Sequence, residues 1–83
     1  MTKKEIDQEF KNTTLELHKG LPSDKPFPPD VVRRRELLLF AQVHLIKILD
    51  AKHNKDRLAE IVHLGLYNVF KFHYYNMKIE RIN

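Results

Sequence analysis

Cysteine is absent from the sequence, glycine occurs twice, and serine occurs only at position 23. Without cysteine the chain can form no disulfide framework, no cysteine-ligated zinc site and no thiol nucleophile. Two glycines are too few for a glycine-rich phosphate loop, and Ser23 lies in a proline-rich stretch. A chain of 83 residues also has little room for a catalytic pocket. We therefore expect a protein that is not an enzyme and that binds no cofactor.

Long apolar runs and a strong charge imbalance are missing as well. The longest stretches without a charged residue are 37–46 and 61–70, which are far shorter than the roughly 20 apolar residues of a membrane span. The first residues, MTKKEIDQEF, lack the apolar segment of a signal peptide. The formal net charge of +4 allows a polyanionic partner without requiring one. We expect a soluble, cytoplasmic protein that does not contact membranes.

Residues 36–49, ELLLFAQVHLIKIL, are the most apolar part of the chain. At about 100° per residue, their apolar side chains cover more than half of the circumference of a helix. A helix with so much apolar surface must pack on more than one side. Prolines precede this stretch and Asp30 is available as an N-terminal cap, so we expect a helix from about residue 29 to residue 52.

The N-terminal residues 2–19 have the pattern of an amphipathic helix. Thr2 and Glu5 form a capping-box pattern at its start. The residues expected on its packed face are Ile6, Phe10, Thr13 and Leu17. Because this face is narrow and contains a threonine, we expect the helix to lie across the other helices.

A proline-rich linker, GLPSDKPFPP, spans residues 20–29. Its four prolines exclude a helix and favour an extended, stiff connector. Pro26 and Pro29 also form a PxxP pattern, which leaves open the alternative of a ligand for an SH3-type domain.

The third helix is expected from about residue 55 to residue 80, with Asn54 or Asp56 as its cap. Because the link between the second and third helices is so short, these helices must form an antiparallel hairpin. The sequence thus predicts an all-α, single-domain chain: a long helical hairpin with the N-terminal helix packed across it.

The second and third helices carry more apolar surface than one chain of three helices can bury. Apolar surface of this extent is typical of an interface, and a two-fold dimer is the simplest arrangement that covers it. We therefore predict a homodimeric bundle that also presents helix surfaces to a protein partner. The interface residues that we expect are Phe40, Val43, Leu66, Phe70, Tyr74 and Met77.

Three consecutive arginines, Arg33, Arg34 and Arg35, begin the second helix. If the hairpin turn centres near residue 54, positions at the same level have numbers that sum to about 108. The arginines then lie level with residues 73–75, HYY. This juxtaposition has two interpretations, namely arginine–tyrosine packing within the chain or a basic, aromatic surface that binds nucleic acid. The residues of the second interpretation are Arg33, Arg34, Arg35, Lys71, Tyr75 and Lys78.

Two weaker patterns remain. The same level rule brings His44 near His63, and residues 60–63 have a Glu-x-x-His spacing. No carboxylate is expected at their level on the second helix, so we predict no metal site. Residues 58–72 partly fit a helix-turn-helix spacing, but His63 occupies the turn position usually given to glycine. A continuous helix is the simpler interpretation.

Overall fold

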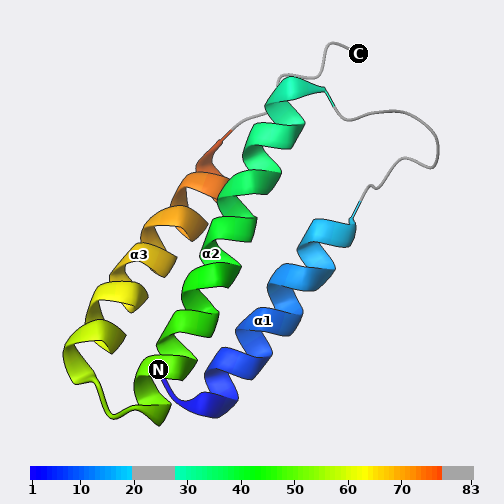
Figure 1. The fold of residues 1–83 in the computed structure, drawn as a ribbon. Coiled ribbons are helices and arrows are strands. Elements are labelled where there is room, and N and C mark those ends of the chain that lie inside the picture. The colour runs from blue at the N-terminus through cyan, green and yellow to red at the C-terminus, as the bar shows by residue number, and fades with distance from the viewer. Residues whose placement is uncertain (20–27, 78–83) are drawn as a thin grey trace.

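The computed structural model describes residues 1–19 and 28–77, which form three α-helices and, within these ranges, no strand. Helix α1 spans Lys3–His18, α2 spans Pro29–His53 and α3 spans Arg57–Asn76 (Figure 1). The all-α fold with three helices is therefore confirmed. The proline-rich segment 20–27 lies outside the described residues. Among the described helices, none is both long and apolar enough to cross a membrane.

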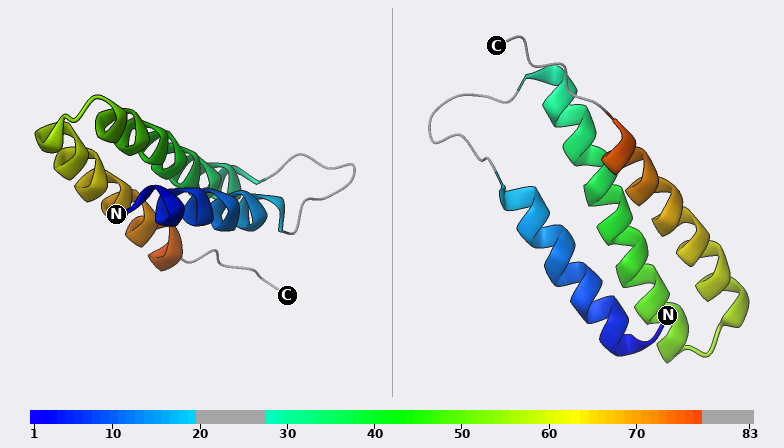
Figure 2. Two further views of the ribbon diagram at one scale, coloured as in Figure 1. Left: turned by 90° about the horizontal axis from the view of Figure 1, so that it is seen from below. Right: turned by 180° about the vertical axis from the view of Figure 1, so that it is seen from behind.

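Helices α2 and α3 form an antiparallel hairpin, and α1 runs beside α2 in the opposite direction (Figures 1 and 2). The start of α1 lies near the α2–α3 turn (Figure 1). Helix α3 ends at Asn76, because Met77 takes an extended backbone conformation, whereas the pattern placed its end near residue 80. The helical hairpin agrees with the sequence, whereas α1 was expected to lie across the hairpin and instead runs alongside α2.

Side-chain hydrogen bonds cap the N-terminal ends of α1 and α3 but not that of α2. The Thr2 hydroxyl accepts from the Glu5 amide, and the Glu5 carboxylate accepts from the Thr2 amide, each at 3.1 Å. Asp56 caps α3 by accepting from the amide of Ala59 at 3.1 Å. Helix α2 begins at Pro29 as expected, but the expected Asp30 cap was wrong: Pro28 is the N-cap and makes no side-chain cap hydrogen bond, while Asp30 lies inside the first turn. There its carboxylate acts through the helix dipole.

The α2–α3 turn is closed by backbone hydrogen bonds. The amide of Asp56 donates to the carbonyl of Ala51 at 2.8 Å, and that of Lys55 donates to Lys52 at 3.2 Å. Lys55 has a φ of 56°, in the left-handed region. This conformation costs a non-glycine residue roughly 1–2 kcal/mol, so the turn is held by the helices that it joins.

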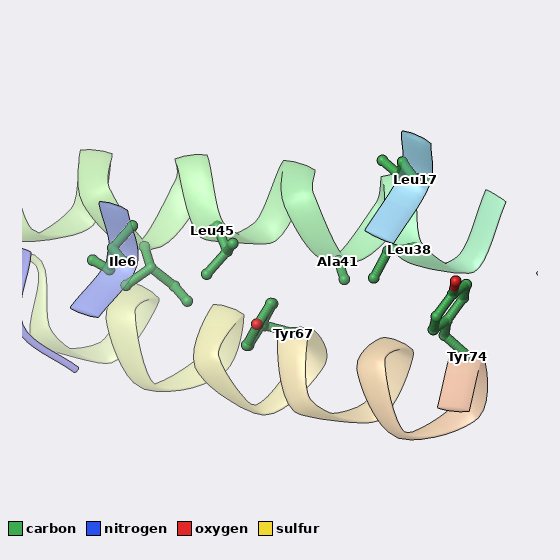
Figure 3. Packing of buried hydrophobic residues seen from close by; sticks show 8 residues of the cluster. Ile6, Leu17, Leu38, Ala41, Leu45, Tyr67 and Tyr74 are labelled. Carbon is green, nitrogen blue, oxygen red and sulfur yellow. The ribbon is translucent and has the colours of Figure 1, made fainter. Parts of the chain in front are cut away.

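The core lies where the three helices meet (Figure 3). Tyr67 and Tyr74 point from α3 toward α2, where Leu38 and Leu45 are fully buried (Figure 3). Helix α1 contributes apolar side chains near its two ends. The buried hydrophobic residues of this cluster are Ile6, Leu17, Leu38, Ala41, Leu45, Ile48, Tyr67 and Tyr74.

Polar contacts fix α1 on the hairpin. The Gln42 amide donates to the hydroxyls of Thr13 and Thr14, each at 2.9 Å. Lys71 of α3 forms an ion pair with Glu9 at 3.1 Å. The buried Thr13 hydroxyl donates to the Glu9 carbonyl within α1 at 2.9 Å and accepts from Gln42, so it is hydrogen-bonded in both roles.

Candidate functional site on the open side of the hairpin

The side of the α2–α3 hairpin away from α1 carries exposed apolar and aromatic side chains. Phe40 is 51 % exposed and Val43 is 45 % exposed on α2, while Leu66 is 38 % exposed on α3. We call this surface the hairpin face. Its members are Phe40, Val43, His44, His63, Leu66 and Phe70. All lie on α2 or α3, at helical spacings that bring them to one side.

Aromatic contacts join the two helices across the hairpin face. The ring centroids of Phe40 and Phe70 are 5.6 Å apart. The His44 ring lies 5.4 Å from the Phe70 ring, with only 9° between the two planes. Phe70 is therefore partly buried between two residues of α2, while Phe40 stays exposed. Contacts between its own aromatic side chains therefore hold the hairpin face in one arrangement.

Two histidines meet within this surface. The Nδ1 atom of His44 lies 3.0 Å from the Nδ1 atom of His63, so one ring donates a hydrogen bond and the other accepts it. The ring centroids are 5.2 Å apart and the planes differ by 27°. The level rule for the hairpin had placed these two positions together, and the structure confirms it.

The surroundings of His44 favour a neutral ring. Burial lowers its pKa, and the neighbouring His63 and Lys47 lower it further. A proton shared between two neutral imidazoles avoids placing two positive charges side by side. The His44 ring at the centre of the hairpin face is therefore held toward its uncharged form.

Charged residues flank the apolar stripe of α2. Glu36, Phe40, Val43 and Lys47 fall at i, i+4, i+7 and i+11, which places them on one side of the helix. Both Glu36 and Lys47 are exposed. The stripe therefore begins with an acid and ends with a base, with two apolar side chains between them.

The sequence placed both Tyr74 and Met77 in an interface, but Tyr74 packs within the chain. Tyr74 is 4 % exposed, and its hydroxyl donates to the Glu16 carboxylate at 3.0 Å. Burial and this carboxylate raise the pKa of Tyr74 to about 12. Met77 is partly buried at the end of α3. Neither residue belongs to the hairpin face.

The arginine cluster is engaged largely within the chain. The Arg34 guanidinium lies 4.0 Å from the centroid of the Tyr74 ring, and its Nε donates to the Tyr74 carbonyl at 3.0 Å. Arg35 donates to the carbonyl of Leu17. Arg33 is exposed. Residues 34 and 74 lie at the same level of the hairpin, as the level rule predicts. The contact between them is the arginine–tyrosine packing within the chain, which was the first of the two interpretations.

The other candidate residues for polyanion binding have different surroundings. Lys71 is paired with Glu9, on the side of α3 that meets α1. Tyr75 is 54 % exposed and makes an edge contact with Tyr74, at 5.0 Å between centroids. Lys78 lies outside the described residues. Of the described candidates, Arg33 and Tyr75 are exposed, whereas Lys71 is engaged by Glu9.

Comparison with known proteins adds nothing to this geometry. No family model, curated protein or solved structure matches the chain.

Histidine and carboxylate side chains are distributed over residues 1–19 and 28–77. In these ranges no three histidine or carboxylate side chains are placed to hold a metal ion together. A hollow of about 340 Å³ between α1 and α2 is lined mainly by apolar side chains, which include Phe10, Ile46 and Leu49. What the molecule offers chemically is the hairpin face, with its aromatic rings and paired imidazoles.

Sequence reasoning missed the role of Gln42. A single glutamine in an apolar stretch gives no signal of its own, although Thr13 on the packed face of α1 indicated that a polar partner was needed. In the structure Gln42 is that partner.

Proposed function

We propose that the protein is a non-enzymatic interaction protein that self-associates through the hairpin face. The observation that carries this proposal is the exposure of Phe40 and Val43 beside Leu66, at 51 %, 45 % and 38 %. Apolar side chains gathered on one side of a two-helix layer lose contact with water when a second layer covers them. Each fully buried side chain of this type contributes roughly 1.5–3 kcal/mol.

A second copy of the chain is the partner that this surface fits. In a two-fold, antiparallel pairing of α2 centred between residues 41 and 42, Glu36 of one chain lies level with Lys47 of the other. Phe40 then lies level with the other chain's Val43. The stripe is therefore complementary to itself in both charge and shape, which favours a dimer over an unrelated partner.

A second apolar surface remains on the outer side of α3. Leu58 is 73 % exposed, Ile61 is 55 % exposed and Phe72 is 63 % exposed. Side chains of this kind could not all be covered by pairing through the hairpin face. We propose that this outer surface of α3 binds a protein partner, so that the dimer acts as a scaffold.

Nucleic-acid binding is the less supported alternative. It requires the arginine cluster to face a phosphate backbone, but Arg34 and Arg35 contact groups of their own chain. Lys71 is engaged by Glu9. A measurement of binding to duplex DNA at physiological salt separates the two functions, because phosphate contacts give a steep dependence on salt.

Solution mass tests self-association. We expect the full chain to sediment as a dimer at micromolar concentration and the Phe40→Glu variant to sediment as a monomer. Leu15→Glu is the matched control: Leu15 is 66 % exposed, lies on α1 outside the hairpin face, and its substitution should leave the dimer intact.

Charge reversal tests the pairing of α2. Glu36→Lys and Lys47→Glu alone should each weaken the dimer, and the double variant should restore it, because the two charges exchange places. A monomeric full chain at high micromolar concentration would refute the proposal, as would a dimer that is equally stable in Phe40→Glu and Leu15→Glu.

A further inference from the structure

Two imidazole nitrogens that face each other across two rigid helices have the arrangement of a bidentate metal site. The Nδ1 atoms of His44 and His63 are 3.0 Å apart and come from α2 and α3. We propose that this pair binds one divalent transition-metal ion, of which Zn²⁺ is the representative, through both Nδ1 atoms. Both ligands belong to one chain, and they lie within the hairpin face that the proposed dimer covers.

The spacing of the two nitrogens suits such an ion. With zinc–nitrogen distances of 2.0–2.1 Å, two ligands of a tetrahedral ion lie roughly 3.3 Å apart. The present separation of 3.0 Å is therefore within a few tenths of an ångström of what coordination needs. A small rotation of either ring supplies the difference, without any movement of the helices.

The surroundings hold the ligands in place. The His44 ring lies nearly parallel to the Phe70 ring, at 9° and 5.4 Å, which restricts its rotation. Both histidines are half-buried, so their rotamers are limited by packing on α2 and α3. Ligands that are already positioned lose little conformational entropy on binding.

The two imidazoles can exchange the hydrogen bond between their Nδ1 atoms for coordination of one metal ion. When neutral, one ring carries its proton on Nδ1 and the other on Nε2. Coordination requires the first ring to move its proton to Nε2, which solvent can mediate, and no net proton is released. The ion exchanges two of its water ligands for the two imidazoles and keeps solvent at its other positions.

The donor set selects the class of ion. Imidazole nitrogens suit zinc, copper and nickel, whereas magnesium and calcium prefer oxygen ligands. Lys47 is the charged side chain that acts on His44, and its positive charge opposes any cation. Because both ligands are imidazole nitrogens, we expect a site that discriminates strongly against Mg²⁺.

Calorimetric titration of the full chain with zinc chloride tests the proposal. We expect one zinc ion per chain, and an affinity at least tenfold lower in His44→Gln and in His63→Gln. His18→Gln and His53→Gln are matched controls, since both residues are exposed histidines on other parts of the described structure, and their binding should be unchanged. Circular dichroism confirms that each variant keeps its helices.

Long-range ¹H–¹⁵N spectra of the histidine rings identify the coordinating atoms. On zinc addition the Nδ1 resonances of His44 and His63 should shift and the Nε2 atoms should carry the protons. Zinc affinity that is equal in all four variants would overturn the proposal, as would zinc-induced shifts confined to other histidines. Failure of both the full chain and the monomeric Phe40→Glu variant to bind zinc would refute this site alone and leave the proposed self-association standing.

Discussion

Two buried tyrosines of α3 provide a test of the core, because removal of one hydroxyl should have opposite effects at the two positions. Tyr67 and Tyr74 lie seven residues apart on the same side of the helix, at 1 % and 4 % exposure. The Tyr74 hydroxyl donates to Glu16 at 3.0 Å. Within the described residues the buried Tyr67 hydroxyl makes no hydrogen bond of ordinary geometry, although the Glu9 carboxylate lies near enough to raise its pKa.

The two tyrosines differ because the carboxylate near each hydroxyl has a different partner. Burial raises the pKa of Tyr67, and Glu9 raises it further, but Glu9 directs its carboxylate to Lys71 at 3.1 Å and 3.4 Å. An unpaired buried hydroxyl costs roughly 1–3 kcal/mol, whereas a hydrogen bond to a charged group contributes roughly 1.5–3 kcal/mol. Tyr67→Phe should therefore stabilise the fold by about 1 kcal/mol, and Tyr74→Phe should destabilise it by about 2 kcal/mol.

Thermal unfolding measures both effects. In a domain of this size, 1 kcal/mol shifts the melting temperature by about 4–8 °C. Tyr67→Phe should thus melt several degrees above the parent protein and Tyr74→Phe roughly 10 °C below it. All three proteins must be compared at one concentration, because self-association makes the melting temperature depend on concentration.

The outcome for Tyr67→Phe decides whether the reasoning is right. A loss of 1 kcal/mol or more would show that its hydroxyl has a partner in the folded protein, for instance Glu9. A loss at both positions of equal size would refute the assignment of Tyr74 as the only one of the two with a hydrogen bond.

Three further predictions concern the turn, the core and pH. Lys55→Gly should stabilise the protein by about 0.5–1 kcal/mol in urea unfolding, because glycine adopts the positive φ of 56° without strain; a loss of stability would contradict the left-handed turn. Leu45→Ala should cost about 2–5 kcal/mol in the same assay, since Leu45 is fully buried, and a cost below 1 kcal/mol would contradict the packing of the core. Above pH 10, stability should fall: the pKa of Tyr74 is raised to about 12, so between these values the unfolded state loses a proton that the folded state keeps. The loss approaches roughly 2–3 kcal/mol at pH 12 and should be smaller in Tyr74→Phe.

The sequence by itself determined the helices and the register of the hairpin. Apolar periodicity located all three helices. Local hydrogen bonding located the cap at Thr2 and left Asn54 or Asp56 for α3, of which the structure has Asp56. Because only three residues separate α2 from α3, the link allows one antiparallel register, and this is why the contacts of His44 with His63 and of Arg34 with Tyr74 could be expected.

Only the tertiary structure decided where α1 lies and which apolar residues it covers. The linker before α2 is too long to fix a register, so nothing local indicated that Gln42 would bind Thr13 or that Glu16 would meet Tyr74. These contacts bury Tyr74, although its position on an apolar helix face resembles that of exposed Phe40. Apolar periodicity shows that a side chain must be buried. Which helix buries it depends on long-range packing.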